Sequence, residues 1–303
     1  MVKDRFIKRR FSMLSGYLKL IQPRSSSARL IVSTYITMSS QSQNSIAQRF
    51  RSLHVPGKPL VLTNVWDGIT ANAIAALPQT KAIATASFAV AAAAGLPDDD
   101  LDLTTNLRAV GVISKVAAKH DLPLTVDFQD GFGSDLEEGI RQVIRLGAVG
   151  INLEDYGRDI NGLYLVEQQC DRIKKVIAVA KEEGVPDFVV NARTDALFAG
   201  RDLDEAIKRG KAYLDAGAFN VFIWGGPSRQ GWSGEEVTKA SKALDGRLNV
   251  ILVRGKAGGL SVKEIGDLGV ARISIGPALM RWSVEQIGQE AGRILEGKAV
   301  GEV

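Results

Sequence analysis

The ten residues LGAVGINLED, at positions 146–155, decide the fold because they contain one whole repeat of it. Leu146 ends a stretch with helical periodicity, and Gly147 stands where a left-handed helix cap is expected. The apolar run Gly150–Leu153 has the length and composition of a strand buried on both faces. Two acids, Glu154 and Asp155, follow it directly. This order predicts a helix, a tight turn, a buried parallel strand and a polar strand end.

The same order recurs along the chain. Gly217 and Gly269 repeat the glycine that follows a helical pattern and precedes a strand. Apolar runs predict eight strands, at Leu60–Val65, Ala82–Ala86, Leu124–Val126, Gly150–Leu153, Phe188–Ala192, Asn220–Ile223, Val250–Val253 and Arg272–Ile275. Amphipathic segments predict helices at Ile69–Ala76, Leu103–Lys119, Leu136–Leu146, Val166–Glu183, Leu203–Ala216, Gly234–Leu244, Val262–Leu268 and Ala278–Leu295.

These repeats predict an α/β fold, a (β/α)8 TIM-type barrel with an extra C-terminal helical segment. Each strand with its helix spans roughly 25–40 residues, the size of a right-handed β-crossover-β unit. An open doubly wound sheet is the alternative. It is disfavoured because no Gly-x-Gly-x-x-Gly opens a helix after the first strand.

Composition limits the class of protein. The net charge is +4, but the positive excess lies within residues 1–50, and the remainder is slightly acidic, which does not favour nucleic-acid binding. The single cysteine, Cys170, excludes an internal disulfide framework and a multi-cysteine zinc site. No apolar run approaches the ~18 residues of a membrane-spanning helix.

Residues 1–45 are interpreted as a disordered or targeting extension, and residues 46–303 as the barrel. The extension is rich in arginine and serine and nearly free of acids, which is typical of a mitochondrial transit peptide. A disordered tail, or a true start at Met38, explains the same composition. The predicted location is therefore mitochondrial or cytoplasmic.

Polar residues follow most of the predicted strands, where the chemistry of a barrel is concentrated. Asp98, Asp127 and Glu154 come from the ends of three different strands. Carboxylates that converge at one mouth repel one another unless a cation lies between them. Oxygen ligands favour Mg²⁺ or Mn²⁺. Arg193 offers a planar fork for a substrate carboxylate or phosphonate.

Each of these residues also has a structural interpretation. Asp127 and Asp130 are suited to cap a turn or helix, and Glu154 with Asp155 to a solvated strand end. Arg193 and Asp195 are suited to a structural ion pair. Only their joint placement on one rim favours a site.

At these residues the chain resembles the isocitrate lyase / phosphoenolpyruvate mutase superfamily, and within it the carboxyvinyl-carboxyphosphonate phosphonomutase-like subgroup. The resemblance runs from about Arg49 to the C-terminus. It is carried, in this order, by Val65–Asp67, Gly95–Asp98, Val126–Gly133, Gly150–Asp155, Asn191–Ala196 and Val270–Pro277.

The resemblance implies a Mg²⁺-dependent site that binds an α-keto or 2-hydroxy carboxylate and stabilises an enolate-type state. It also implies a homo-oligomer, a tetramer or dimer, in which the last helix is exchanged. Its implied metal ligands are Asp127, Asp98, Glu154 and Gln129, its implied substrate-binding residues are Trp66, Asp67, Ser87, Phe88 and Arg193, and its catalytic candidates are Arg193, Glu154 and Tyr156.

Two departures from the family pattern bear on activity. Gln129 stands where relatives usually have a second acid, so one negative charge is missing. The loop after Glu154 and Asp155 lacks the Lys-Lys-Cys-Gly-His segment of the C–C lyases, and Cys170 is interpreted as a packing residue in the next helix. Isocitrate cleavage is therefore disfavoured, and Tyr156 or Tyr164 remains for proton transfer.

Three functions stay open. The first is a metal-dependent lyase or phosphonomutase-like enzyme that performs C–C cleavage, decarboxylation or C–P chemistry. The second is a catalytically reduced relative that binds a keto acid without turnover. The third is a phosphate-binding barrel enzyme, for which Arg254–Gly259 would supply the glycine-rich loop.

Overall fold

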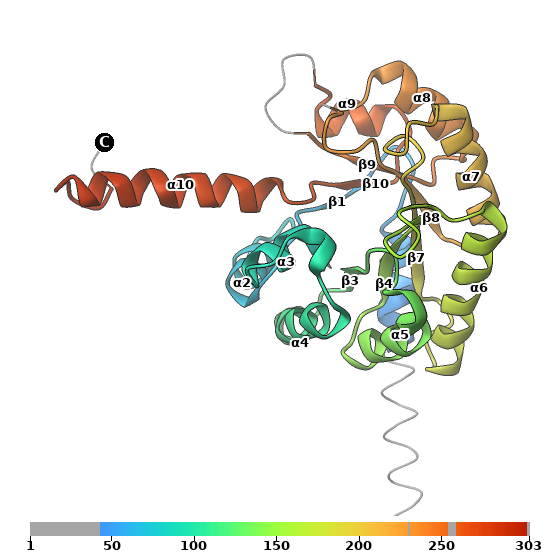
Figure 1. Cartoon of the computed structure of the whole chain (residues 1–303), viewed down its shortest axis with the longest axis horizontal. Helices are drawn as coiled ribbons and strands as arrows, with labels where there is room; N and C mark the ends of the chain where they lie inside the picture. Colours follow the sequence, from blue (N-terminus) through green and yellow to red (C-terminus); the bar gives the residue numbers. More distant parts are fainter. Residues whose placement is uncertain (1–42, 230, 254–258, 302–303) are drawn as a thin grey trace, which may run out of the picture. The chain divides into compact units, whose positions relative to one another are not determined.

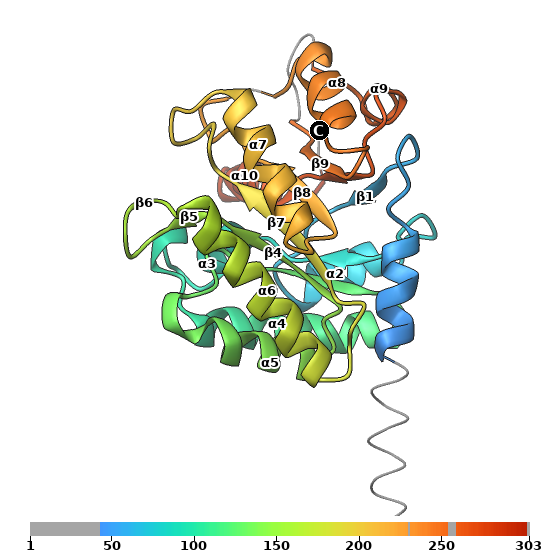
Figure 2. The same ribbon diagram turned by 90° about the vertical axis from the view of Figure 1, so that its right-hand side faces the viewer.

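The computed structural model describes residues 43–229, 231–253 and 259–301, and within them eight parallel strands form a nearly closed barrel (Figures 1 and 2). Their order around the barrel is β1-β10-β9-β8-β7-β4-β3-β2. A parallel bridge between Val65 and Thr85 links the chain beyond β1 to the chain beyond β2. The strands are β1 (Leu60–Leu62), β2 (Ile83–Ala84), β3 (Leu124–Asp127), β4 (Gly150–Glu154), β7 (Val189–Thr194), β8 (Asn220–Ile223), β9 (Leu248–Ile251) and β10 (Arg272–Ser274).

Helices surround the strands, as the amphipathic segments predict (Figure 2). The long helices are α2 (Gly68–Ala75), α4 (Leu103–Lys119), α5 (Leu136–Arg145), α6 (Val166–Glu182), α7 (Leu203–Asp215), α8 (Gly234–Ala243) and α10 (Ala278–Leu295), with the shorter α9 (Val262–Asp267). The expected glycine caps are confirmed, since Gly147, Gly217 and Gly269 have φ of 101°, 105° and 86°. Only glycine adopts this left-handed conformation without strain.

Several elements differ from the sequence-based expectation, and among them β1 and β2 are shorter than predicted. β9 begins at Leu248, two residues before the predicted Val250, because the polar Asn249 points inward and donates to Ser274 Oγ at 3.1 Å. Residues that were expected to form a loop form α3 (Ser87–Ala93), since its alanines favour a helix. A hairpin of β5 (Tyr156–Gly157) and β6 (Gly162–Leu163) follows β4.

The barrel interior contains a chain of side-chain amides. Asn191 Nδ2 donates to Asn152 Oδ1 at 2.8 Å, and Asn220 Nδ2 donates to Asn191 Oδ1 at 2.9 Å. These residues are direct register partners on β4, β7 and β8. Arg272 of β10 is fully buried and donates to the same Asn152 Oδ1 at 3.1 Å. Polar groups at this depth require such partners.

A helix over residues 43–52 packs against the beginning of the barrel. The buried Phe50 ring comes so close to Gly150 that a Cβ there would lie 3.0 Å from it. His54, just beyond this helix, donates through Nδ1 to Phe50 O at 2.9 Å. Residues 1–42 lie outside the described residues, so the extension over residues 1–45 and its targeting role stay predictions.

The last helix, α10, extends away from the barrel (Figure 1). Met280 is its buried residue, whereas Ile287 is 67% exposed and Leu295 is 88% exposed. This confirms the extra C-terminal helical segment. Among the described helices, none combines the length and the apolar character needed to cross a membrane.

Candidate active site

The site is built around Asp127, the last residue of β3. Its Oδ2 accepts from the backbone N–H of Ser87 at 2.9 Å, and its own N–H donates to Thr85 Oγ1 at 2.8 Å. Its second oxygen, Oδ1, is buried and has no hydrogen-bond partner among the described residues. A buried carboxylate oxygen without a partner is costly, so it marks a place where a donor or a cation fits.

Gln129 joins Asp98 to this group. The Gln129 side chain donates through Nε2 to both the backbone O and Oδ1 of Asp98, each at 3.0 Å. Its Oε1 is a second buried oxygen without a partner in the described chain. Burial, and then the charge of Asp127, raise the pKa of Asp98 to about 6. Two unpartnered oxygens beside a destabilised carboxylate are what an oxygen-ligated cation would relieve.

Glu154 and Arg193 form the opposite part of the site, on neighbouring strands β4 and β7. Arg193 Nη1 lies 2.8 Å from Glu154 Oε2, and Arg193 Nε donates to Asp195 Oδ1 at 2.7 Å. Burial raises the pKa of Glu154 well above its ordinary value, and the charge of Arg193 opposes that rise. Burial also lowers the pKa of Arg193, but the charges of Asp195 and Glu154 outweigh it, so the guanidinium stays charged. The expected ion pair of Arg193 with Asp195 is thus present inside the site.

Three aromatic rings in successive contact, here called the aromatic wall, extend from Arg193. The guanidinium lies 4.1 Å from the centroid of the Trp224 ring, which is 5.3 Å from that of Phe198. Phe198 is in turn 5.3 Å from Tyr156, whose hydroxyl donates to Asn161 Oδ1 at 3.0 Å. The structure therefore places Tyr156 at the far end of this wall, bonded within its own hairpin. Its catalytic role stays a prediction.

Asp155, the neighbour of Glu154, faces away from the site. It is fully buried, and its carboxylate accepts from the Asp195 N–H at 2.8 Å, from Tyr213 Oη at 2.6 Å and from Arg209 Nη1 at 3.1 Å. Successive residues of a strand point to opposite sides, so only Glu154 of the pair enters the barrel. Asp155 instead braces the end of β4 against α7.

The residues predicted to bind substrate after β1 and β2 are only partly brought together. Asp67 caps α2, accepting from the Thr70 N–H at 2.7 Å through Oδ1. Trp66 and Phe88 pack in one cluster with Met280 of α10, and Ser87 contacts Asp127 through its backbone. Binding by Trp66, Asp67, Ser87 and Phe88 therefore stays a prediction, with Ser87 nearest to the carboxylates.

Other residues singled out by the sequence lie elsewhere. Cys170 packs against the core from α6, and burial raises the pKa of its thiol, which agrees with a packing role. Gly131 and Gly133 have positive φ, as expected for a tight turn. Residues 254–258, most of the glycine-rich stretch of the phosphate-binding alternative, fall outside the described residues.

Sequence reasoning missed two functional neighbours. Trp224 directly follows β8, so the strand-end rule that selected the other residues would have found it. The same rule would have selected Asn64, two residues beyond β1, although not its contacts. Its Nδ2 donates to Thr85 O at 2.7 Å and its Oδ1 accepts from the Ile275 and Gly276 N–H groups. It therefore closes the barrel beside Asp127.

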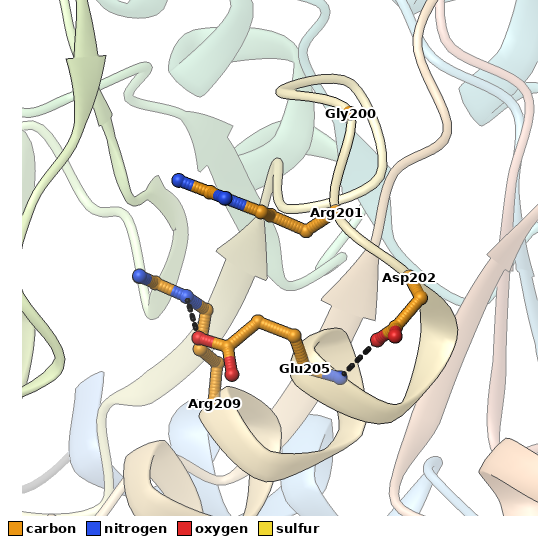
Figure 3. Close-up of a pocket in the computed structure, with 5 residues that line it drawn as sticks. All are labelled: Gly200, Arg201, Asp202, Glu205 and Arg209. Atoms are coloured by element: carbon orange, nitrogen blue, oxygen red, sulfur yellow. Dashed lines mark hydrogen bonds and ion pairs between the residues drawn. The ribbon is translucent and has the colours of Figure 1, made fainter.

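A cavity of about 530 Å³ lies at the N-terminus of α7, and its lining does not include Asp98, Asp127 or Glu154. Gly200, Arg201, Asp202, Glu205 and Arg209 line it (Figure 3). Arg209 pairs with Glu205 at 3.1 Å on the cavity side and with Asp155 on the other. The unpartnered oxygen of Asp127 and the buried Arg193 lie outside the lining of this cavity, so they form a separate candidate site.

The donor set is compatible with a hydrated magnesium ion. In the described chain, no three His, Cys, Asp or Glu side chains gather closely enough to enclose an ion by themselves. Mg²⁺ usually keeps several waters and takes one or two carboxylates. The free oxygens of Asp127 and Gln129 suit that kind of site.

Comparison with known proteins shows the family of the chain. The model of the phosphoenolpyruvate phosphomutase family matches residues 50–295. The chain belongs to this family. It is similar to 2-methylisocitrate lyase of Bacillus subtilis, with 31% identity over 62% of this chain and 63% of the relative. The fold and the relatives identify it as an enzyme of the isocitrate lyase/phosphoenolpyruvate mutase superfamily.

Two solved structures of the family are also similar. A putative phosphonomutase from Burkholderia cenocepacia J2315 has a TM-score of 0.74 and 33% identity, covering 84% of this chain and 100% of that one. A phosphonopyruvate hydrolase in complex with oxalate and Mg²⁺ has a TM-score of 0.73 and 26% identity, covering 85% of this chain and 89% of that one.

Proposed function

We propose that this family member is a Mg²⁺-dependent lyase or phosphonomutase-like enzyme that acts on a small α-keto or 2-hydroxy carboxylate. The chemistry is C–C cleavage, decarboxylation or C–P bond chemistry through an enolate-type state. The observation that carries the proposal is the buried, unpartnered Oδ1 of Asp127 beside Asp98. The Mg²⁺ complex of the similar phosphonopyruvate hydrolase supports it.

Mg²⁺, or Mn²⁺ in its place, would be held by Asp127, Asp98, Gln129 and Glu154, directly or through water. Oxygen ligands of this type match either ion. When bound, the ion supplies positive charge that stabilises a developing enolate oxygen. It would also offset the burial and the repulsion by Asp127 that together raise the pKa of Asp98.

Arg193 would bind and orient the substrate carboxylate. Its Nε and Nη1 are already used by Asp195 and Glu154, and no hydrogen bond of its Nη2 occurs within the described residues. The stacking on Trp224 keeps the guanidinium plane fixed. A planar, pre-oriented donor loses little entropy when it binds a carboxylate.

The direct test is Mg²⁺-dependent pyruvate formation from oxaloacetate, 2-methylmalates and phosphonopyruvate. We expect turnover of at least one substrate, its loss in Asp127→Ala, and its retention in the control Asp99→Ala. Asp99 is an exposed acid next to Asp98, so this control removes a nearby charge without touching the proposed ligands. No turnover of any substrate by folded protein would count against the enzymatic proposal.

A catalytically reduced, metabolite-binding protein is the second candidate. The observation that favours it is the β5–β6 hairpin, which contains no Cys, Lys or His and in which the Tyr156 hydroxyl is already bonded to Asn161. Under this alternative, Mg²⁺ plus oxalate raises thermal stability although no substrate is consumed. The absence of both effects would exclude even binding.

We also propose that the protein is a homo-oligomer, a dimer or tetramer, in which another subunit covers α10. The exposed apolar residues Val284, Ile287 and Leu295 on this helix support the proposal. Exposed apolar surface of this kind marks protein–protein contacts. The location, mitochondrial or cytoplasmic, remains a prediction from the composition of residues 1–45.

A further inference from the structure

We infer that Arg158 is a positioning residue that fastens the β5–β6 hairpin to the segment carrying Asp98, so that the two move as one unit. The inference rests on the proposed function in one respect, namely that Asp98 is a proposed metal ligand. The structural part, a clasp between two loops, stands on contacts alone.

Arg158 sits in the turn of the hairpin and reaches two other loops. Its Nη1 donates to the backbone oxygens of Asp99, at 3.2 Å, and Leu101, at 2.9 Å. Its Nε and Nη2 donate to Asp130 Oδ1 at 3.3 and 3.1 Å, and its backbone N–H donates to Asp130 Oδ2 at 3.0 Å. One side chain therefore joins the segments that follow β2, β3 and β4.

Asp130 is the fixed end of this clasp. It is only 2% exposed, its Oδ1 also accepts from the Phe132 N–H at 3.1 Å, and Arg172 Nη2 donates to its backbone oxygen. The Phe132 ring lies 5.1 Å from the Arg158 guanidinium. Because both carboxylate oxygens of Asp130 already accept hydrogen bonds, Asp130 is an anchor and not a metal ligand. Arg158 is the residue through which the hairpin binds this anchor.

The other end of the clasp is the 3-10 turn η1 (Asp98–Asp100). Gln129 holds the first residue of η1, through Asp98 O and Oδ1. Arg158 holds the later carbonyls, those of Asp99 and Leu101. Without Arg158 these two carbonyls lose their side-chain donor, the far end of the turn is held by the buried Leu101 side chain and the backbone alone, and Asp98 loses part of the pre-organisation that a ligand needs.

A planar guanidinium is needed for this arrangement because three acceptors in two loops must be reached at once. A lysine at position 158 would keep a positive charge opposite Asp130. Its single ammonium group does not present the same rigid fork to Asp130 and to two carbonyls. Lysine therefore separates a clasp from simple charge compensation.

The test compares Arg158→Met and Arg158→Lys with Arg141→Met in the full-length protein. Arg141 is a matched control, since its side chain is 28% exposed against 25% for Arg158 and also bonds two acceptors, Glu182 and Glu183, but on the outer surface. The first readout is hydrogen exchange without metal. We expect faster exchange at residues 98–101 and 156–163 together in both Arg158 variants and not in the control. Unchanged exchange at either segment would overturn the clasp.

The second readout is the Kd for Mg²⁺, measured calorimetrically in the presence of oxalate. We expect it to rise about tenfold in Arg158→Met and in Arg158→Lys, and to be unchanged in Arg141→Met. Affinity like that of the wild type in Arg158→Lys would mean that only charge matters, which refutes the positioning role. If the wild type itself bound no Mg²⁺, the proposed function would fail, while hydrogen exchange would still decide the clasp.

Discussion

Replacing Gln129 with Glu should make the stability of the protein depend strongly on Mg²⁺. The change restores the second acid that relatives usually carry, but it removes the donor that Nε2 offers to Asp98 O and Oδ1 at 3.0 Å. A carboxylate oxygen would then face a carboxylate oxygen. In Mg²⁺-free buffer the pair must either repel or take up a proton.

The cost follows from the distance. Two unit charges 3.0 Å apart repel by about 5 kcal/mol at an effective dielectric constant of ~20. The pair can instead take up a proton on Asp98, whose pKa is already raised to about 6, and this costs about 1.4 kcal/mol at pH 7, which limits the loss. We therefore expect the added charge in Gln129→Glu to cost about 1.4 kcal/mol of unfolding free energy without Mg²⁺, or roughly 3 °C in Tm.

The assay is thermal or urea unfolding with EDTA and with saturating Mg²⁺, with Gln129→Met as the control. The Met variant loses the two hydrogen bonds but adds no charge, so its deficit should be insensitive to Mg²⁺. The Glu variant should recover most of its deficit in Mg²⁺, because binding to the native state alone adds stability. Equal stability of Gln129→Glu and the wild type in EDTA would refute the geometry described for Asp98 and Gln129.

Three other perturbations test separate parts of the structure. Burial and the nearby positive charge of Arg272 lower the pKa of His54 to about 3. Below pH ~6.5 the unfolded state therefore protonates His54 while the folded state does not. As the pH is lowered, the free energy of unfolding should fall by about 1.4 kcal/mol per pH unit more in the wild type than in His54→Gln. The same pH dependence in both proteins, measured by urea unfolding, would contradict this. Asp155→Asn leaves the buried Arg209 short of a counter-charge and should cost about 3 kcal/mol in chemical unfolding, a loss that a structural role requires. Ile287→Asp should reduce the mass measured by light scattering, whereas Gln286→Asp, at the adjacent and also exposed position, should not.

Regular features of this molecule were predictable because they depend on local chemistry. The glycines that end α5, α7 and α9 could be recognised because few other residues adopt a positive φ cheaply. The strands could be recognised because both faces are buried, which leaves continuous apolar runs. Asp127 and Glu154 follow from the rule that chemistry lies at the strand ends of a barrel.

The rest depends on partners that are distant in the chain. That Asp130 anchors Arg158, and that Gln129 donates to Asp98, could not be inferred from residues 98, 129, 130 and 158, since each is polar and suited to several contacts. The shifted start of β9 has the same origin, because Asn249 looks like a loop residue until Ser274 is placed opposite it. The alternation of side chains along β4 would have separated Glu154 from Asp155, had it been applied.

The asparagine chain across β4, β7 and β8 has a consequence for how the barrel assembles. Asn191 donates through its nitrogen to Asn152 and accepts through its oxygen from Asn220, so both neighbours fix the orientation of this central amide. Shifting the register of any of these strands by one residue would turn its amide outward. The other two amides and Arg272 would then lose hydrogen-bond partners in the buried interior. The apolar side chains alone would be compatible with several strand registers, whereas the hydrogen-bonded amides are compatible with one. The amides should therefore select the native register when β4, β7 and β8 pair during folding.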